Sequence, residues 1–252
     1  MAGSFEGRVI VVTGGSSGVG RACVELLTEE RATVANIDIN QTSPELQQPA
    51  LEVTADVSDQ AALDAAMQRI ASELGGIDVL VNNAGVSFIG GIEDGTDDDW
   101  TRLLNINLMG YVRTTRAALP YLRRSGAASI VNISSTTATS GFRKRALYSA
   151  TKGAIEAMTR SVAADLVEEA ITVNAVNPGT VDTPFMTELA ARSEDPARTR
   201  AAFEARQPTQ RMVHPREVAR AVAYCCHPDN RSLVGSTLVV DGGILGLHIT
   251  DA

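Results

Sequence analysis

Short runs of apolar, mostly β-branched residues recur along the chain, and longer segments with helical periodicity separate them. We predict strands at 9–13, 33–38, 51–56, 78–83, 129–134, 172–176 and 237–241. Runs that are apolar throughout are typical of parallel strands with helices packed on both faces. The pattern therefore indicates a sheet that is buried on both sides.

The segments between these runs repeat apolar residues at helical spacing. We predict helices at 21–30, 60–74, 98–124, 148–169 and 215–226. Strand and helix alternate along the whole chain, which predicts an α/β fold with a doubly wound parallel sheet. At 252 residues the chain fits one large domain, residues 1–252, better than two small ones.

One segment, residues 183–214, interrupts the alternation with three prolines and polar helical pieces. A connection of this length without a strand is often a lid over a binding site, although a surface insertion without a function is the alternative. We predict a substrate lid.

Charge and composition exclude several classes of partner. A net charge of −8 argues against a surface for nucleic acid or anionic lipid. No apolar run approaches the roughly 20 residues of a membrane helix, and the start "MAGSFEGR" does not resemble a secretion signal. The chain has an odd number of cysteines, Cys23, Cys225 and Cys226, and no CxxC motif. This pattern is typical of buried thiols in a reducing compartment. We expect a cytoplasmic protein.

We predict no metal site. The three histidines show no ligand spacing, and the acidic run "EDGTDDDW" at 93–100 fits the start of a helix, where negative charge is favourable.

A glycine-rich turn joins the first predicted strand to the first predicted helix. In "VVTGGSSGVGRA", Gly14 allows a tight turn, Gly18 lets the backbone approach a pyrophosphate, and Gly20 lets helix and strand pack closely. Ser16, Ser17 and Val19 complete this predicted dinucleotide loop.

An acidic residue follows at the end of the second strand, 18 residues beyond Gly20. The Asp38 carboxylate is placed to accept hydrogen bonds from ribose hydroxyls and to repel a 2′-phosphate. No basic residue stands at Ser16, Ser17 or Ile39, so we predict NAD as the cofactor rather than NADP. Solvation of a loop by Asp38 is the alternative.

The stretch "LYSATK" contains Lys152, one of two lysines beside twenty arginines. Tyr148 and Lys152 are four residues apart and share a helix face. A nearby ammonium favours a phenolate and so lowers the pKa of the phenol. Tyr148 is therefore a candidate general base that takes the proton of a substrate alcohol, and a general acid that protonates a carbonyl in the reverse direction. "NISS" and "NNAG" place further polar residues at the carboxyl ends of strands.

The motifs TGGSSGVG, NNAG, NISS, YSATK, NPGTVDTP and VVDGG follow one another along nearly the whole chain. In order and spacing they resemble the short-chain dehydrogenase/reductase family. The resemblance implies one Rossmann-type domain with a seven-stranded parallel sheet, and a homotetramer assembled through helices 98–124 and 148–169.

The resemblance also implies roles for individual residues. It gives a catalytic set of Asn107, Ser135, Tyr148 and Lys152, in which Ser135 binds the substrate oxygen and Asn107 holds a water beside Lys152. Its cofactor contacts are Asp56 and Val57 for adenine, Asn83, Ala84 and Gly85 for ribose and nicotinamide, and Pro178, Gly179, Val181 and Thr183 around the carboxamide. Local structural roles are the alternative for three of these: a kink at Asn107, a helix cap at Thr183 and a backbone bond at Ser135.

The substrate is less well defined by the sequence. Arg145 lies three residues before Tyr148, and Arg206 lies in the predicted lid. Guanidinium groups bind carboxylates at two points, so we expect the substrate to be a hydroxy or keto acid. The alternative is that Arg145 and Arg206 are surface arginines without a role in binding. The chain is similar to a subgroup with type 2 3-hydroxybutyrate and 2-keto-3-deoxy sugar-acid dehydrogenases. It departs from that subgroup at Leu189, where relatives tend to carry an arginine.

Three functions follow as hypotheses. The first is an NAD-dependent alcohol dehydrogenase for a small hydroxy acid or sugar acid. The second, favoured by Phe185 and Met186 in the lid, is a reductase of a larger apolar ketone. The third is a dinucleotide-binding protein without catalysis, which the intact catalytic set disfavours.

Overall fold

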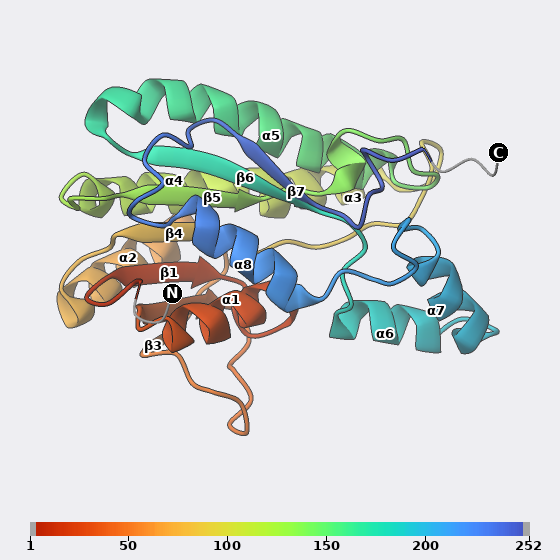
Figure 1. Ribbon diagram of the computed structural model, residues 1–252, viewed down its shortest axis with the longest axis horizontal. Helices are drawn as coiled ribbons and strands as arrows, with labels where there is room; N and C mark the ends of the chain where they lie inside the picture. The colour runs from red at the N-terminus through yellow and green to blue at the C-terminus, as the bar shows by residue number, and fades with distance from the viewer. Residues whose placement is uncertain (1–3, 249–252) are drawn as a thin grey trace.

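A seven-stranded parallel sheet forms the centre of the computed structural model, which describes residues 4–248 (Figure 1). Its strands are β1 (Val9–Thr13), β2 (Thr33–Asp38), β3 (Leu51–Thr54), β4 (Val79–Asn82), β5 (Ser129–Ile133), β6 (Thr172–Pro178) and β7 (Thr237–Val240). They lie in the order β3-β2-β1-β4-β5-β6-β7, and all neighbours are parallel. The predicted fold class is confirmed. The strand order reverses between β1 and β4, which is where such sheets bind ligands.

Helices cover both faces of the sheet, and each layer has its own apolar core. On one face α1 (Gly18–Glu29) and α8 (Pro215–Cys225) pack together against the strands. On the other face lie α2 (Gln60–Leu74), α4 (Met109–Leu122) and α5 (Ala146–Leu166). Strands β1, β4, β5 and β6 are buried at every residue, as expected for central parallel strands.

The prediction of one continuous helix over 98–124 is wrong. The segment contains α3 (Asp97–Leu103), a π-helical turn η1 (Leu104–Leu108) and α4. A π turn is a short local widening of a helix that has no sequence pattern of its own, so periodicity does not reveal it. The acidic run forms the first turn of α3 as expected, and a reciprocal pair of hydrogen bonds between Thr96 and Asp99 caps the helix.

Two short helices lie beside the sheet layers in the segment predicted as a lid: α6 (Pro184–Ala191) and α7 (Pro196–Glu204) (Figure 1). Met186, Phe203 and Met212 give them a small core of their own. Both ends of the segment are tied together, because Val181 and Val213 form a parallel bridge. The helical pieces are confirmed, and the role as a lid stays a prediction.

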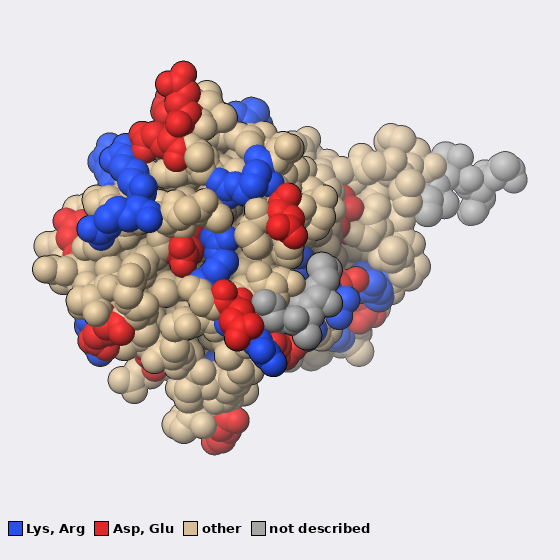
Figure 2. Space-filling model, turned by 60° about the vertical axis from the view of Figure 1, so that its left-hand side comes forward, with Lys and Arg blue, Asp and Glu red and all other residues tan. Residues whose placement is uncertain are grey.

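The three cysteines are buried, as predicted, and burial raises the pKa of Cys23 to about 12. On the face in Figure 2, basic side chains are interspersed with acidic ones. None of the helices in the described part of the chain has the length and apolar content needed to cross a lipid bilayer.

Candidate active site

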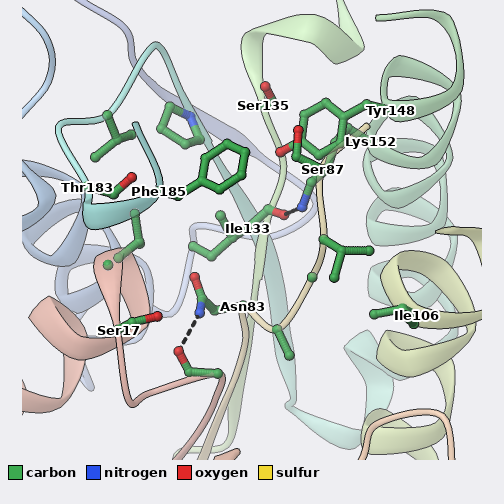
Figure 3. Close-up of a pocket in the computed structure, with 18 of the residues that line it drawn as sticks. Ser17, Asn83, Ser87, Ile106, Ile133, Ser135, Tyr148, Lys152, Thr183 and Phe185 are labelled. Atoms are coloured by element: carbon green, nitrogen blue, oxygen red, sulfur yellow. Dashed lines mark hydrogen bonds between the residues drawn. The ribbon is translucent and has the colours of Figure 1, made fainter. Parts of the chain in front are cut away.

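A cleft of about 930 Å³ opens at the carboxyl ends of the strands (Figure 3). Its walls come from the turns after β1, β2, β3, β4, β5 and β6 and from the first residues of α6. Sequence segments far apart along the chain therefore meet at one edge of the sheet, at the point where the strand order reverses.

The glycine turn after β1 forms one end of the cleft, and its shape requires glycine. Gly14 has a left-handed backbone with φ +69°. A Cβ on Gly20 would lie 2.1 Å from the carbonyl oxygen of Gly14, so no larger residue fits there. Ser17 precedes α1, makes no capping bond with its side chain, and faces the cleft. This cradle at a helix N-terminus fits a pyrophosphate.

Asn83, after β4, fastens this turn from the other side. Its side-chain nitrogen donates to the carbonyl oxygens of Thr13 and Gly14 at 3.0 and 3.1 Å. The Thr13 hydroxyl in turn accepts the backbone N–H groups of Asn83 and Ala84. The ends of β1 and β4 are thus joined where the cleft begins, and the protein's own hydrogen bonds hold the glycine turn in shape.

Asp38, at the end of β2, lines the cleft and also supports the glycine turn. One carboxylate oxygen accepts the backbone N–H of Ser16 at 3.0 Å, and the other accepts that of Asn40. The position of Asp38 is therefore compatible with both roles considered from the sequence, binding of ribose hydroxyls and support of the loop. Ser16 itself bonds to Asn36 and Asn40 and does not line the cleft, and neither does Gly20.

Tyr148, Lys152 and Ser135 gather on the opposite wall of the cleft from Thr183 and Phe185 (Figure 3). The first two stand one turn apart on α5, and Ser135 follows β5. The Ser135 hydroxyl lowers the pKa of the Tyr148 phenol, and its oxygen accepts the N–H of Thr137 at 3.3 Å. The predicted Tyr–Lys–Ser grouping is present in space.

The lowering of the Tyr148 pKa expected from Lys152 is not among the effects found on this phenol, and it stays a prediction. Lys152 is 4% exposed, its nitrogen donates to the Ile133 carbonyl oxygen at 2.8 Å, and it lies 5.7 Å from the centre of the Tyr148 ring. Burial lowers the pKa of Lys152 to about 8. Burial also raises the pKa of Tyr148, while Arg145 and the Ser135 hydrogen bond lower it. Spacing on a helix could not reveal this, because the pKa depends on the depth of burial.

Asn107 is fully buried in the π-helical turn and does not line the cleft. Its side chain accepts the N–H of Val86 and donates to the carbonyl of Val86 and to the Thr151 hydroxyl. The amide therefore ties η1 to the turn after β4 and to α5. A water held beside Lys152 stays a prediction.

Two arginines predicted to bind substrate both line the cleft. Arg145 donates to the Ser87 hydroxyl and the Phe88 carbonyl, and Arg206 stacks over Phe203 at 4.7 Å. Arg145 is partly buried and Arg206 is exposed, and desolvation lowers the pKa of both; the charge of Arg145 lowers that of Arg206 further. Within residues 4–248 neither guanidinium forms an ion pair with a carboxylate.

The remaining predicted cofactor residues also line the cleft: Gly18, Val19, Asp56, Val57, Ala84, Gly85, Pro178, Gly179, Val181 and Thr183. Thr183 precedes α6 but makes no capping bond with its side chain. Sequence reasoning missed several wall residues, including Arg102, Ile106, Phe142 and Thr180. Ile106 sits beside Asn107 and Thr180 lies inside NPGTVDTP, so motif membership could have indicated both. Arg102 and Phe142 carry no such signal.

Comparison with known proteins agrees with this geometry. The family model described as enoyl-(acyl carrier protein) reductase matches residues 14–245. The chain is 37% identical over 251 residues to cis-4-hydroxycyclohexanecarboxylate dehydrogenase of Sinomonas cyclohexanicum, covering 96% of this chain and 98% of that one. It is 34% identical over 246 residues to a 3-oxoacyl-(acyl-carrier-protein) reductase of Vibrio harveyi, with the same coverage. Ligand-free aldohexose dehydrogenase of Thermoplasma acidophilum superposes with a TM-score of 0.91 at 32% identity, over 98% of both chains.

Proposed function

Because the chain belongs to the short-chain dehydrogenase/reductase family, whose members use NAD or NADP, we propose that it is an NAD-dependent oxidoreductase. It interconverts a secondary alcohol and a ketone on a small hydroxy acid or sugar acid. The observation that carries this proposal is the grouping of Tyr148, Ser135 and Lys152 on one wall of the cleft, in which Tyr148 lies one turn from Lys152 and interacts with Ser135 so that the pKa of the phenol is lowered.

A bound nicotinamide dinucleotide supplies the hydride acceptor or donor. Tyr148 takes the hydroxyl proton as an alcohol is oxidised and returns it to the carbonyl oxygen in reduction. The Ser135 hydroxyl holds the same substrate oxygen. The positive charge that favours the Tyr148 phenolate comes from Arg145, since Arg145 lowers the pKa of that phenol.

We assign the cofactor to the cradle and walls already described. The turn from Gly14 to Gly20 takes the pyrophosphate, Asp56 and Val57 the adenine, and the segment from Pro178 to Thr183 the carboxamide, with Asn83 to Gly85 beside the ribose and nicotinamide. Lys152, with three donors at the cleft wall, binds ribose hydroxyls. Asp38 supports NAD over NADP, because its carboxylate accepts ribose hydroxyls and repels a 2′-phosphate.

Arg145 and Arg206 support a carboxylate on the substrate. The two guanidinium groups line one cleft and the charge of Arg145 lowers the pKa of Arg206, so the two cations repel each other. Among residues 4–248 neither has a carboxylate partner, so an anionic substrate group would relieve this repulsion. The departure at Leu189 is not offset by Arg192, which is exposed and pairs with Glu188. One relative is a dehydrogenase of cis-4-hydroxycyclohexanecarboxylate, a hydroxylated ring acid, which is compatible with this assignment.

The test is a panel of secondary hydroxy acids, each paired with its methyl ester, with NAD and NADP as oxidants. We expect the acid to be preferred over its ester and NAD over NADP. Arg206→Ala should raise KM for the acid but not for the ester; it is cleaner than Arg145→Ala, because Arg145 also acts on Tyr148. Equal use of acid and ester would contradict the carboxylate assignment.

A larger apolar ketone is the second candidate. Phe142, Phe185 and Met186 line the cleft, Phe185 is 49% exposed, and one relative is a 3-oxoacyl reductase. Acyl or steroid-like ketones belong in the same panel, and a preference for them with NADPH would favour this candidate. We also propose a homotetramer, which light scattering would test.

A further inference from the structure

Tyr111 is a second tyrosine next to Lys152, and the function proposed above gives it no role. It lies on α4, one turn beyond Asn107, and is 1% exposed. It does not line the cleft, so it contacts neither substrate nor cofactor there. A buried tyrosine needs a partner for its hydroxyl, and the choice of partner indicates its role.

The Tyr111 hydroxyl donates to the carbonyl oxygen of Ile133 at 3.2 Å. The same oxygen accepts the ammonium of Lys152 at 2.8 Å. A carbonyl oxygen has two lone pairs, so both donors are accommodated. The hydroxyl thus fixes the acceptor that holds Lys152 at the end of β5.

The ring of Tyr111 also faces the ammonium. Lys152 Nζ lies 5.5 Å from the centre of the Tyr111 ring and 5.7 Å from that of Tyr148. Both distances fall within the roughly 6 Å over which an aromatic face attracts a cation. The buried ammonium therefore contacts two rings, that of Tyr148, which lines the cleft, and that of Tyr111, which does not.

We propose that Tyr111 is a positioning residue for Lys152: its ring stabilises the buried ammonium, and its hydroxyl holds the carbonyl that accepts it. The catalytic consequence rests on the proposed function, whereas the effect on the lysine does not. Burial, followed by the charge of Tyr148, raises the pKa of Tyr111 well above its ordinary value. Tyr111 therefore remains a neutral donor while Tyr148 exchanges its proton.

Few other titratable groups surround this lysine. Tyr148 lies on the same helix, and Arg145 acts on Tyr148 from the N-cap of α5. Glu156, one turn beyond Lys152, is buried and accepts the Ser134 hydroxyl at 2.9 Å and the Asn177 amide at 2.6 Å. Among the described residues, the titratable groups that contact the ammonium are Tyr148 and Tyr111, both through their rings, and burial is what lowers the pKa of Lys152.

The chain has only two lysines, so Lys152 can be titrated directly by NMR after labelling lysine with ¹³C at Cε. Lys144 is exposed and serves as an internal reference. We expect Tyr111→Leu to lower the Lys152 midpoint by about 0.5 to 1 pH unit, because the ring is lost. Tyr111→Phe, which keeps the ring, should stay within about 0.3 unit of the unaltered protein. Lys144 should titrate alike in all three.

Tyr121→Leu is the matched control, because Tyr121 lies on the same helix and packs against the apolar core on that face of the sheet. An unchanged Lys152 midpoint in folded Tyr111→Leu would overturn the proposal, as would an equal shift in Tyr121→Leu. Alcohol oxidation gives the second readout: the alkaline limb of the kcat/KM profile should move to lower pH in Tyr111→Leu, because the ammonium that binds the cofactor ribose loses its charge at a lower pH. If activity instead falls equally at every pH, in proportion to the fall in melting temperature, Tyr111 acts only as a core residue. Absence of turnover in every protein would contradict the proposed function and leave the NMR result decisive for Tyr111.

Discussion

The ammonium of Lys152 lies 2.8 Å from the carbonyl oxygen of Ile133, the last residue of β5. This contact ties the helix that carries Tyr148 to the edge of the sheet. It also keeps a cation in a nearly fully buried place, where burial lowers the pKa of the lysine from 10.5 to about 8. Holding that charge costs stability.

Lys152→Met should therefore stabilise the fold while abolishing activity. The folded pKa lies below the unfolded one, so the cost is fully present below about pH 8 and disappears as the pH rises through 10.5. At about 1.4 kcal/mol per pH unit, the shift from 10.5 to about 8 is a cost of at most about 3.5 kcal/mol, or a melting temperature roughly 6 °C higher in the variant at pH 7. The gain should shrink toward pH 10.5. Exposed Lys144→Met is the control, and a less stable Lys152→Met at pH 7 would contradict the prediction.

The predicted lid is joined to the segment after β6 by Arg200, whose guanidinium makes a two-point contact with Asp182 at 3.1 and 2.8 Å. Both side chains are more than a third exposed, so the pair contributes little to global stability. Arg200→Ala should raise KM for cofactor and substrate a few-fold and speed proteolysis around residues 192–195, with little change in melting temperature. Arg192→Ala removes an exposed pair within α6 and should change none of these. Identical proteolysis of the two variants would argue against a lid that opens.

Asp38→Asn tests cofactor choice without removing the support of the glycine turn, because the amide oxygen can still accept the Ser16 N–H. The loss of charge should lower the ratio of kcat/KM for NAD over NADP by roughly tenfold, since repulsion of a 2′-phosphate is removed. Asp56→Asn, in the same cleft, should leave the ratio unchanged. An unchanged ratio in Asp38→Asn would indicate that another group sets the preference.

Much of the fold could be predicted because central parallel strands are apolar throughout and the glycine turn has a fixed spacing. Two features of the site could not. The π-helical turn that buries Asn107 has no sequence pattern of its own. The electrostatics of Tyr148 depend on its burial and on Arg145, three positions away, rather than on the lysine four positions away. Tyr111 also escaped notice, because a tyrosine on an apolar helix face is indistinguishable in sequence from an ordinary core residue.

Proton exchange by Tyr148 is the central claim, and Tyr148→Phe tests it most directly, because the change removes one oxygen and keeps the ring. Turnover should be measured beside NAD binding by calorimetry, with exposed Tyr224→Phe as the control. We predict that kcat falls about a thousandfold while the Kd for NAD changes little and the control stays fully active. Near-normal turnover in Tyr148→Phe would contradict the account.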